Sequence, residues 1–122
     1  MDMTTTDPTP TRHRLLSAWE RLREVRQDAA GLPALADIPV ELIRRRRAAE
    51  SAFHEAFMAD PEGAADEALS WAAWARDPLV AQMRVSAGWA SLAAFDARGV
   101  SAELSQAAAK AAWAAVERAE SQ

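Results

Sequence analysis

VELIRRRRAAESAFHEAFM is the sequence of residues 40–58, and this stretch decides the fold class. At about 100° per residue, its apolar side chains fall on one stripe of a helix. The stripe comprises Leu42, Ile43, Ala49, Phe53, Ala56 and Phe57. The chain shows no sustained alternation of polar and apolar residues and has few β-branched residues, so no strand is predicted. The sequence therefore predicts an all-α fold, a single-domain bundle of about five helices.

Four consecutive arginines, Arg44 to Arg47, lie inside this helix. Helical geometry spreads four neighbours around most of the circumference, so they cannot share one face. Arg44 and Arg47 point away from the apolar stripe, and Arg45 lies on its flank. Arg46 falls within the stripe, one turn before Glu50, so we expect these two residues to form an ion pair that is buried or at an interface.

Turn and cap signals divide the rest of the chain. Residues 1–11 are rich in Thr and Pro and are predicted to form a disordered tail, and residues 12–122 to form the helical domain. We predict helices at about 12–30, 38–59, 61–75, 78–97 and 102–120. Asp60-Pro61 and Asp77-Pro78 each read as a helix start, with Asp as the cap and Pro in the first turn. Ser101 is expected to cap the last helix.

Two predicted helices have unusual apolar surfaces. The helix at 78–97 is apolar on two opposed faces, so it is either central in the bundle or covered by a partner, and we favour the central position. The helix at 102–120 has an alanine-rich side that permits close approach of a helix from this chain or from another copy. Trp19 and Trp89 are expected in the core. Trp74 and Trp113 are candidate protein contacts, with core packing as the alternative.

Composition limits the class of protein. The chain has 122 residues, half of them apolar, which suits one domain with a core. It lacks cysteine, which excludes disulfides and thiolate chemistry. The 31 alanines, 13 arginines and single lysine are typical of a high-GC bacterium, its phage or its plasmid. No signal peptide or membrane span is evident, so we expect a cytoplasmic protein with no membrane partner.

The net charge of −4 conceals an uneven distribution. Residues 12–47 carry nine arginines and five acids, whereas residues 48–122 carry five basic and eleven acidic residues. Such a basic region either binds phosphates without reading sequence or is an ordinary solvated surface. The candidate phosphate-binding residues are Arg44, Arg45 and Arg47 with Arg12, Arg14, Arg21 and Arg23.

No pattern in the chain indicates catalysis. His13 and His54 are the only histidines, and neither has the Glu-x-x-His spacing of a helical di-metal site. The four glycines are isolated, so there is no phosphate-cradling loop. We therefore expect no enzyme activity, no metal, no cofactor and no small-molecule substrate. A further hypothesis is a small enzyme or ligand-binding bundle that uses Glu50 and His54. A metal or chromophore retained on purification would favour it.

A compact, cysteine-free helical chain with basic residues on two helices (Arg12, Arg14, Arg21 and Arg23, then Arg44 to Arg47) resembles the small subunit of multisubunit CRISPR effector complexes. The resemblance covers the whole chain in size and architecture and rests on no diagnostic motif. It implies a helical bundle that touches backbone subunits of a complex and contacts the phosphates of RNA or single-stranded DNA through arginines.

Two functional hypotheses follow. The first is a non-catalytic subunit of a larger assembly or homo-oligomer, with the arginines on nucleic-acid backbone. In it, Arg46, Glu50, Trp74 and Trp113 contact proteins. The alternative is a stand-alone helical interaction or regulatory protein, of phage or plasmid type, that never touches nucleic acid.

Overall fold

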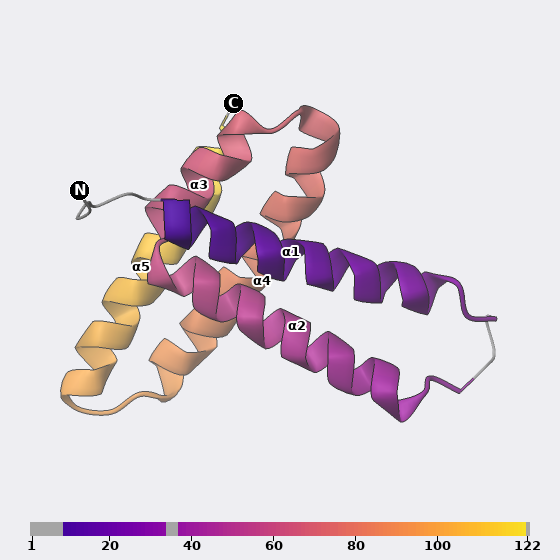
Figure 1. Cartoon of the computed structure of the whole chain (residues 1–122). Coiled ribbons are helices and arrows are strands. Elements are labelled where there is room, and N and C mark those ends of the chain that lie inside the picture. Colours follow the sequence, from indigo (N-terminus) through magenta and orange to yellow (C-terminus); the bar gives the residue numbers. More distant parts are fainter. Residues whose placement is uncertain (1–8, 34–36, 122) are drawn as a thin grey trace, which may run out of the picture. The chain divides into compact units, whose positions relative to one another are not determined.

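The computed structural model describes residues 9–33 and 37–121, with side chains from His13 onward, and in this part of the chain it has five α-helices and no strand (Figure 1). The helices are α1 (Thr9–Ala30), α2 (Val40–Ala59), α3 (Pro61–Ser70), α4 (Ala73–Asp96) and α5 (Val100–Glu120). The predicted all-α fold is confirmed. The chain divides into two compact units, residues 1–56 and 57–122, so the last turn of α2 belongs to the second unit.

The first helices differ slightly from the predicted boundaries. Residues 9–11, predicted to belong to a disordered tail, are the first residues of α1, and the rest of that predicted tail lies outside the described residues. α2 begins at Val40, two residues later than predicted. The carbonyl of Pro39 accepts hydrogen bonds from the N–H groups of Leu42 and Ile43, at 3.0 and 3.2 Å, and so satisfies donors that the first turn leaves open.

In the first unit, α1 and α2 are neighbouring helices (Figure 1). The buried stripe of α1 follows the helical period and comprises Leu15, Ala18, Trp19, Leu22 and Val25. The ring of Trp19 meets that of Phe53 on α2 edge-on, with centroids 6.2 Å apart and planes at 61°. Edge-to-face packing of this kind contributes beyond simple area burial. The prediction that Trp19 fills the core is confirmed.

The apolar stripe predicted for α2 is buried over only half of its length. Ala49, Phe53 and Ala56 are buried, whereas Leu42 is half-buried and Ile43 is exposed. The stripe therefore enters a core only in the second half of the helix. The arginine run lies in the first half, so a position within the stripe does not bury Arg46.

The boundary between α3 and α4 is the main error of the sequence prediction. α3 ends at Ser70, and Trp71 and Ala72 are extended, with ψ of 155° and 151°. α4 then begins at Ala73, so Asp77 is not a cap and Pro78 lies inside the helix. The carbonyl of Ala72 accepts from the N–H groups of Ala75 and Arg76, at 2.9 and 2.8 Å, which holds the extra turn. Pro78 is the sixth residue of this helix, and because it has no N–H it removes one helical hydrogen bond near the helix start.

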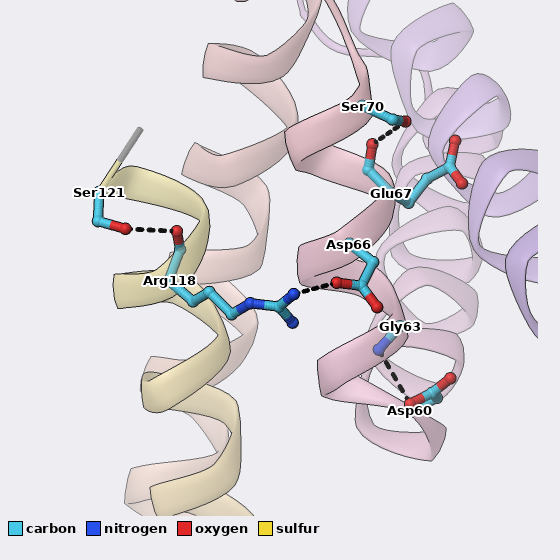
Figure 2. A network of polar contacts seen from close by, with 7 residues as sticks. All are labelled: Asp60, Gly63, Asp66, Glu67, Ser70, Arg118 and Ser121. Carbon is cyan, nitrogen blue, oxygen red and sulfur yellow. Dashed lines mark hydrogen bonds and ion pairs between the residues drawn. The ribbon is translucent and has the colours of Figure 1, made fainter.

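The other Asp-Pro pair behaves as predicted. Asp60 caps α3, and its carboxylate accepts from the N–H of Gly63 at 3.0 Å (Figure 2). A side chain at Gly63 would meet this carboxylate directly, so the cap and the glycine depend on each other. Pro61 occupies the first turn, where its missing N–H costs nothing.

The second unit is built on small side chains. α5 packs mainly on α4 and also on α3. The buried apolar residues of α4 lie on one of its two predicted apolar faces and comprise Leu79, Val80, Met83, Ala87, Ala90 and Ala94. The buried face of α5 comprises Ala109, Ala112, Ala115, Val116 and Ala119. Gly99 precedes α5 with φ +61°, a conformation that favours glycine, so Ser101 lies inside the helix and is not its cap.

The second apolar face of α4 is exposed, and the prediction that this helix is central on both sides is wrong. Val85, Leu92 and Phe95 are all exposed, and Trp89 is 38% exposed and does not fill the core as predicted. The core of this unit needs only one face of α4, because α3 and α5 are short or alanine-rich and enclose little volume.

Candidate functional site

Arg44 and Arg47 point into solvent from α2, as the sequence predicts. The Arg44 side chain is 75% exposed, and its ion pair with Glu41 is long, 3.9 Å from Nη1 to Oε2. Arg47 is exposed, and within the described part of the chain it has no ion pair. Both guanidinium groups can therefore exchange their surroundings for an anion at small cost.

Three other arginines line a surface groove between α1 and α2. Arg21 and Arg45 face a cavity of about 260 Å³ whose floor is alanine and valine. Arg14 and Arg21 face an adjoining cavity of about 280 Å³. Glu24 and Glu55 line the same two cavities, so the groove carries both signs of charge. The sequence named these arginines singly, but only the pairing of the two helices shows that they share a groove.

The remaining candidate arginines do not join this group. Arg23 lies on the other edge of α1 and forms an ion pair with Glu20 at 3.7 Å. The side chain of Arg12 lies outside the described residues. The six described arginines among those predicted to bind phosphate therefore form an outward pair, a groove and a separate edge, and not one continuous patch.

Arg45 and Arg46 have defined carboxylate partners. Arg45 Nη2 lies 2.9 Å from Asp28 Oδ2 and so links the start of α2 to the end of α1. Arg46 Nε lies 3.4 Å from Glu50 Oε2, so the predicted pairing is confirmed. The pair is not buried within the chain, because 57% of the Arg46 side chain is exposed, and the interface position stays a prediction. Exposed pairs of this kind contribute only about 0.3–0.5 kcal/mol.

The two candidate contact tryptophans differ in environment. Trp74 lies in the first turn of α4, not on α3 as predicted, and is 78% exposed. Trp113 is half-buried on α5, and its Nε1–H donates to Ser91 Oγ on α4 at 2.7 Å. Trp71, which ends α3, donates from Nε1 to Glu67 Oε2 at 2.7 Å. Of these three, Trp74 presents the largest open apolar surface.

Glu50 and His54 lie one turn apart in the second half of α2. Glu50 is bound by Arg46, and partial burial lowers the pKa of His54, an effect that nearby Glu55 opposes. In the described part of the chain, no three His, Cys, Asp or Glu side chains gather as potential metal ligands.

A larger groove in the second unit lies between the start of α3 and α5. It encloses about 500 Å³ and is lined mainly by alanines, with Asp60, Glu62 and Arg118 among its charged residues. Asp60 is committed to its cap, and Arg118 binds Asp66 across the two helices (Figure 2). The groove can hold a small apolar group, and two of its three charged side chains already serve the fold.

None of the described helices is long and apolar enough to span a membrane. No protein-family model, curated protein or solved structure matches the chain.

Proposed function

We propose that this chain is a non-catalytic helical subunit of a larger assembly that contacts nucleic-acid backbone through the arginines of its first unit. The observation that supports this most directly is the outward pair Arg44 and Arg47, whose guanidinium groups are exposed and weakly engaged or unengaged within the described residues. Arginine forms bidentate hydrogen bonds to phosphate, so such a pair is suited to a phosphate backbone.

The groove arginines are a second, separate group of candidate phosphate contacts. Arg14, Arg21 and Arg45 line it together with Glu24 and Glu55. These carboxylates reduce the net positive charge, so the expected affinity is low and depends on salt. The arginines would contact phosphates, and contact with the backbone alone would carry no sequence information. Low affinity is sufficient in a subunit that other proteins hold in place.

The protein-contact half of this proposal rests on the second unit. Trp74 and the exposed face of α4 offer apolar surface that suits a protein partner. The resemblance to small subunits of CRISPR effector complexes stays a prediction, since it rests on size and on the placing of arginines. A stand-alone helical interaction protein would use the same α4 surface and no nucleic acid.

Fluorescence polarisation with a labelled single-stranded oligonucleotide across a salt series tests the nucleic-acid half. Neutralising two to four phosphates predicts a slope of roughly −1.5 to −3 in log affinity against log salt, from about −0.7 for each phosphate. Arg44→Ala with Arg47→Ala should lower the affinity and flatten the slope.

A matched control removes the same charge elsewhere. Arg46→Ala with Lys110→Ala also removes two positive charges, one on another side of α2 and one on α5. This variant should bind nearly as well as the wild-type chain. Equal loss in both variants would mean that only overall charge matters, and no binding at low salt would reject the nucleic-acid contact.

A further inference from the structure

The exposed side of α4 carries a continuous row of apolar residues. Because the helix begins at Ala73, the row starts at Trp74 and proceeds with alternating spacings of four and three residues. We call this row the α4 seam; it consists of Trp74, Pro78, Ala81, Val85, Gly88, Leu92 and Phe95. Alternating spacings of four and three keep side chains on one line of a slightly supercoiled helix, which is the pattern of helices that pair with another helix.

The seam is open along its length. Trp74, Leu92 and Phe95 are 78%, 66% and 83% exposed. A Cβ added at Gly88 would meet nothing within 4 Å, so the middle of the seam is also open. A soluble monomer seldom leaves so long an apolar row in water, and such rows usually mark interaction sites. The spacing indicates that the occupant is a helix.

The sizes along the seam indicate which helix. If a second α4 lies antiparallel, with the two-fold axis passing between positions 86 and 87, Phe95, Leu92 and Val85 each face a small or compact residue, and Trp74 falls opposite Gly99, just beyond the helix. Phe95 then lies opposite Pro78, and Leu92 opposite Ala81. Val85 lies opposite Gly88. A parallel pair would instead place Phe95 on Phe95 and Gly88 on Gly88, which gives a clash at one level and a gap at another.

The charges beside the seam agree with the same register. Asp77 and Arg98 lie on the same edge of the seam, and the antiparallel arrangement brings Asp77 of each copy to Arg98 of the other. Asp77 is exposed, and the hydrogen bonds from Arg98 Nη1 to the carbonyls of Asp96 and Ala97 are long, 3.3 and 3.4 Å. Arg84, between them on that edge, is already bound to Glu120 on α5 and does not compete.

We propose that the α4 seam docks against the α4 seam of a second copy of this chain, as an antiparallel two-fold dimer. The contact is isologous, so the same residues serve both copies and the assembly closes at two. This inference deepens the protein-contact half of the proposed function. It does not depend on the nucleic-acid half, because it involves only residues of the second unit.

Sedimentation velocity over a wide range of concentration tests the dimer. The expected result is a species of twice 13.2 kDa whose fraction rises with concentration. Leu92→Arg should abolish it, since the charge would enter the seam. Ala93→Arg adds the same charge at the adjacent exposed position, off the seam, and should leave the dimer intact. Circular dichroism should show unchanged helix content in both variants.

A charge-reversal series tests the antiparallel register. Asp77→Arg alone and Arg98→Asp alone should each weaken the dimer, because like charges then meet. The double variant should restore it, since opposite charges face each other again. A monomer at all concentrations would overturn the proposal, whether another protein or residues of the same chain cover the seam. A dimer that survives Leu92→Arg, or one not rescued by the double reversal, would overturn it equally. Oligonucleotide binding by the same variants reports separately on the arginines.

Discussion

The arginine run on α2 and the apolar seam on α4 differ in how the rest of the molecule compensates them. Each helix carries more residues of one kind than a single face can hold. On α2 the surplus is charge, and neighbours such as Glu41 and Glu50 compensate it within one turn. On α4 the surplus is apolar surface, and no residue of the same helix can compensate it. Local pairing therefore satisfies charge, whereas apolar surface requires another element.

The largest expected effect contrasts one phenylalanine from each helix. Phe53 on α2 is fully buried against Trp19, so Phe53→Ala should lower the free energy of unfolding by about 3–5 kcal/mol. Phe95→Ala on the α4 seam should change it by less than about 0.5 kcal/mol in dilute solution. Urea denaturation at low protein concentration measures both. A large loss in the Phe95 variant would show that the seam is covered within a single chain.

A smaller contrast uses the two Asp-Pro pairs. Asp60→Ala removes the cap of α3 and should cost about 1 kcal/mol. Asp77→Ala removes no cap and should change stability by less than about 0.5 kcal/mol. Thermal melts of the two variants, taken under the same conditions, give the comparison. Equal losses of stability in the two variants would mean that Asp77 does cap a helix.

His54, in the second half of α2, is expected to contribute to the change of stability with pH. Partial burial lowers its pKa below the usual value of 6.5, so the unfolded chain binds a proton more readily than the folded one. The contribution of neutral His54 is complete above pH 6.5 and is lost as pH falls below it. Denaturation midpoints at pH 7.5 and pH 5.5 should therefore differ more in the wild-type chain than in His54→Gln. An equal difference in both chains would assign the effect to carboxylates.

The smallest effect concerns the arginine run itself. Arg46→Ala should lower the free energy of unfolding by only about 0.3–0.5 kcal/mol, because its pair with Glu50 is exposed. Arg47→Ala, which breaks no ion pair within the described residues, should have an effect near zero. Urea midpoints separate the two variants. A loss of several kcal/mol for Arg46 would mean that it is buried, as its position in the stripe suggested.

These contrasts also explain what the sequence could and could not predict. The helical period identified both apolar faces of α4, but it could not show that only one of them is buried, because that depends on the neighbouring helices. The period could not show where along α2 a core begins, so it left Arg46 either buried or at an interface. Asp77-Pro78 matches a helix start in every local respect, and only the hydrogen bonds of Ala72 reveal the extra turn.

The candidate surfaces were predictable to different degrees. Arg44 and Arg47 could be placed from helical angles alone. The grouping of Arg14, Arg21 and Arg45 requires the pairing of two helices, which no single-helix pattern contains. The sequence predicted part of the α4 seam as a second apolar face. It did not predict that the helix begins at Ala73, which adds Trp74 to the seam.

The placing of the tryptophans has a spectroscopic consequence. The chain has no tyrosine, so its five tryptophans dominate the near-ultraviolet signal. Trp19 is the only one in residues 1–56, and it is buried, whereas the second unit contains four. In Trp19→Phe the fluorescence would report the second unit alone, while circular dichroism would still report both. Melting curves from the two signals would then coincide if the units unfold as one cooperative block and separate if each has its own transition.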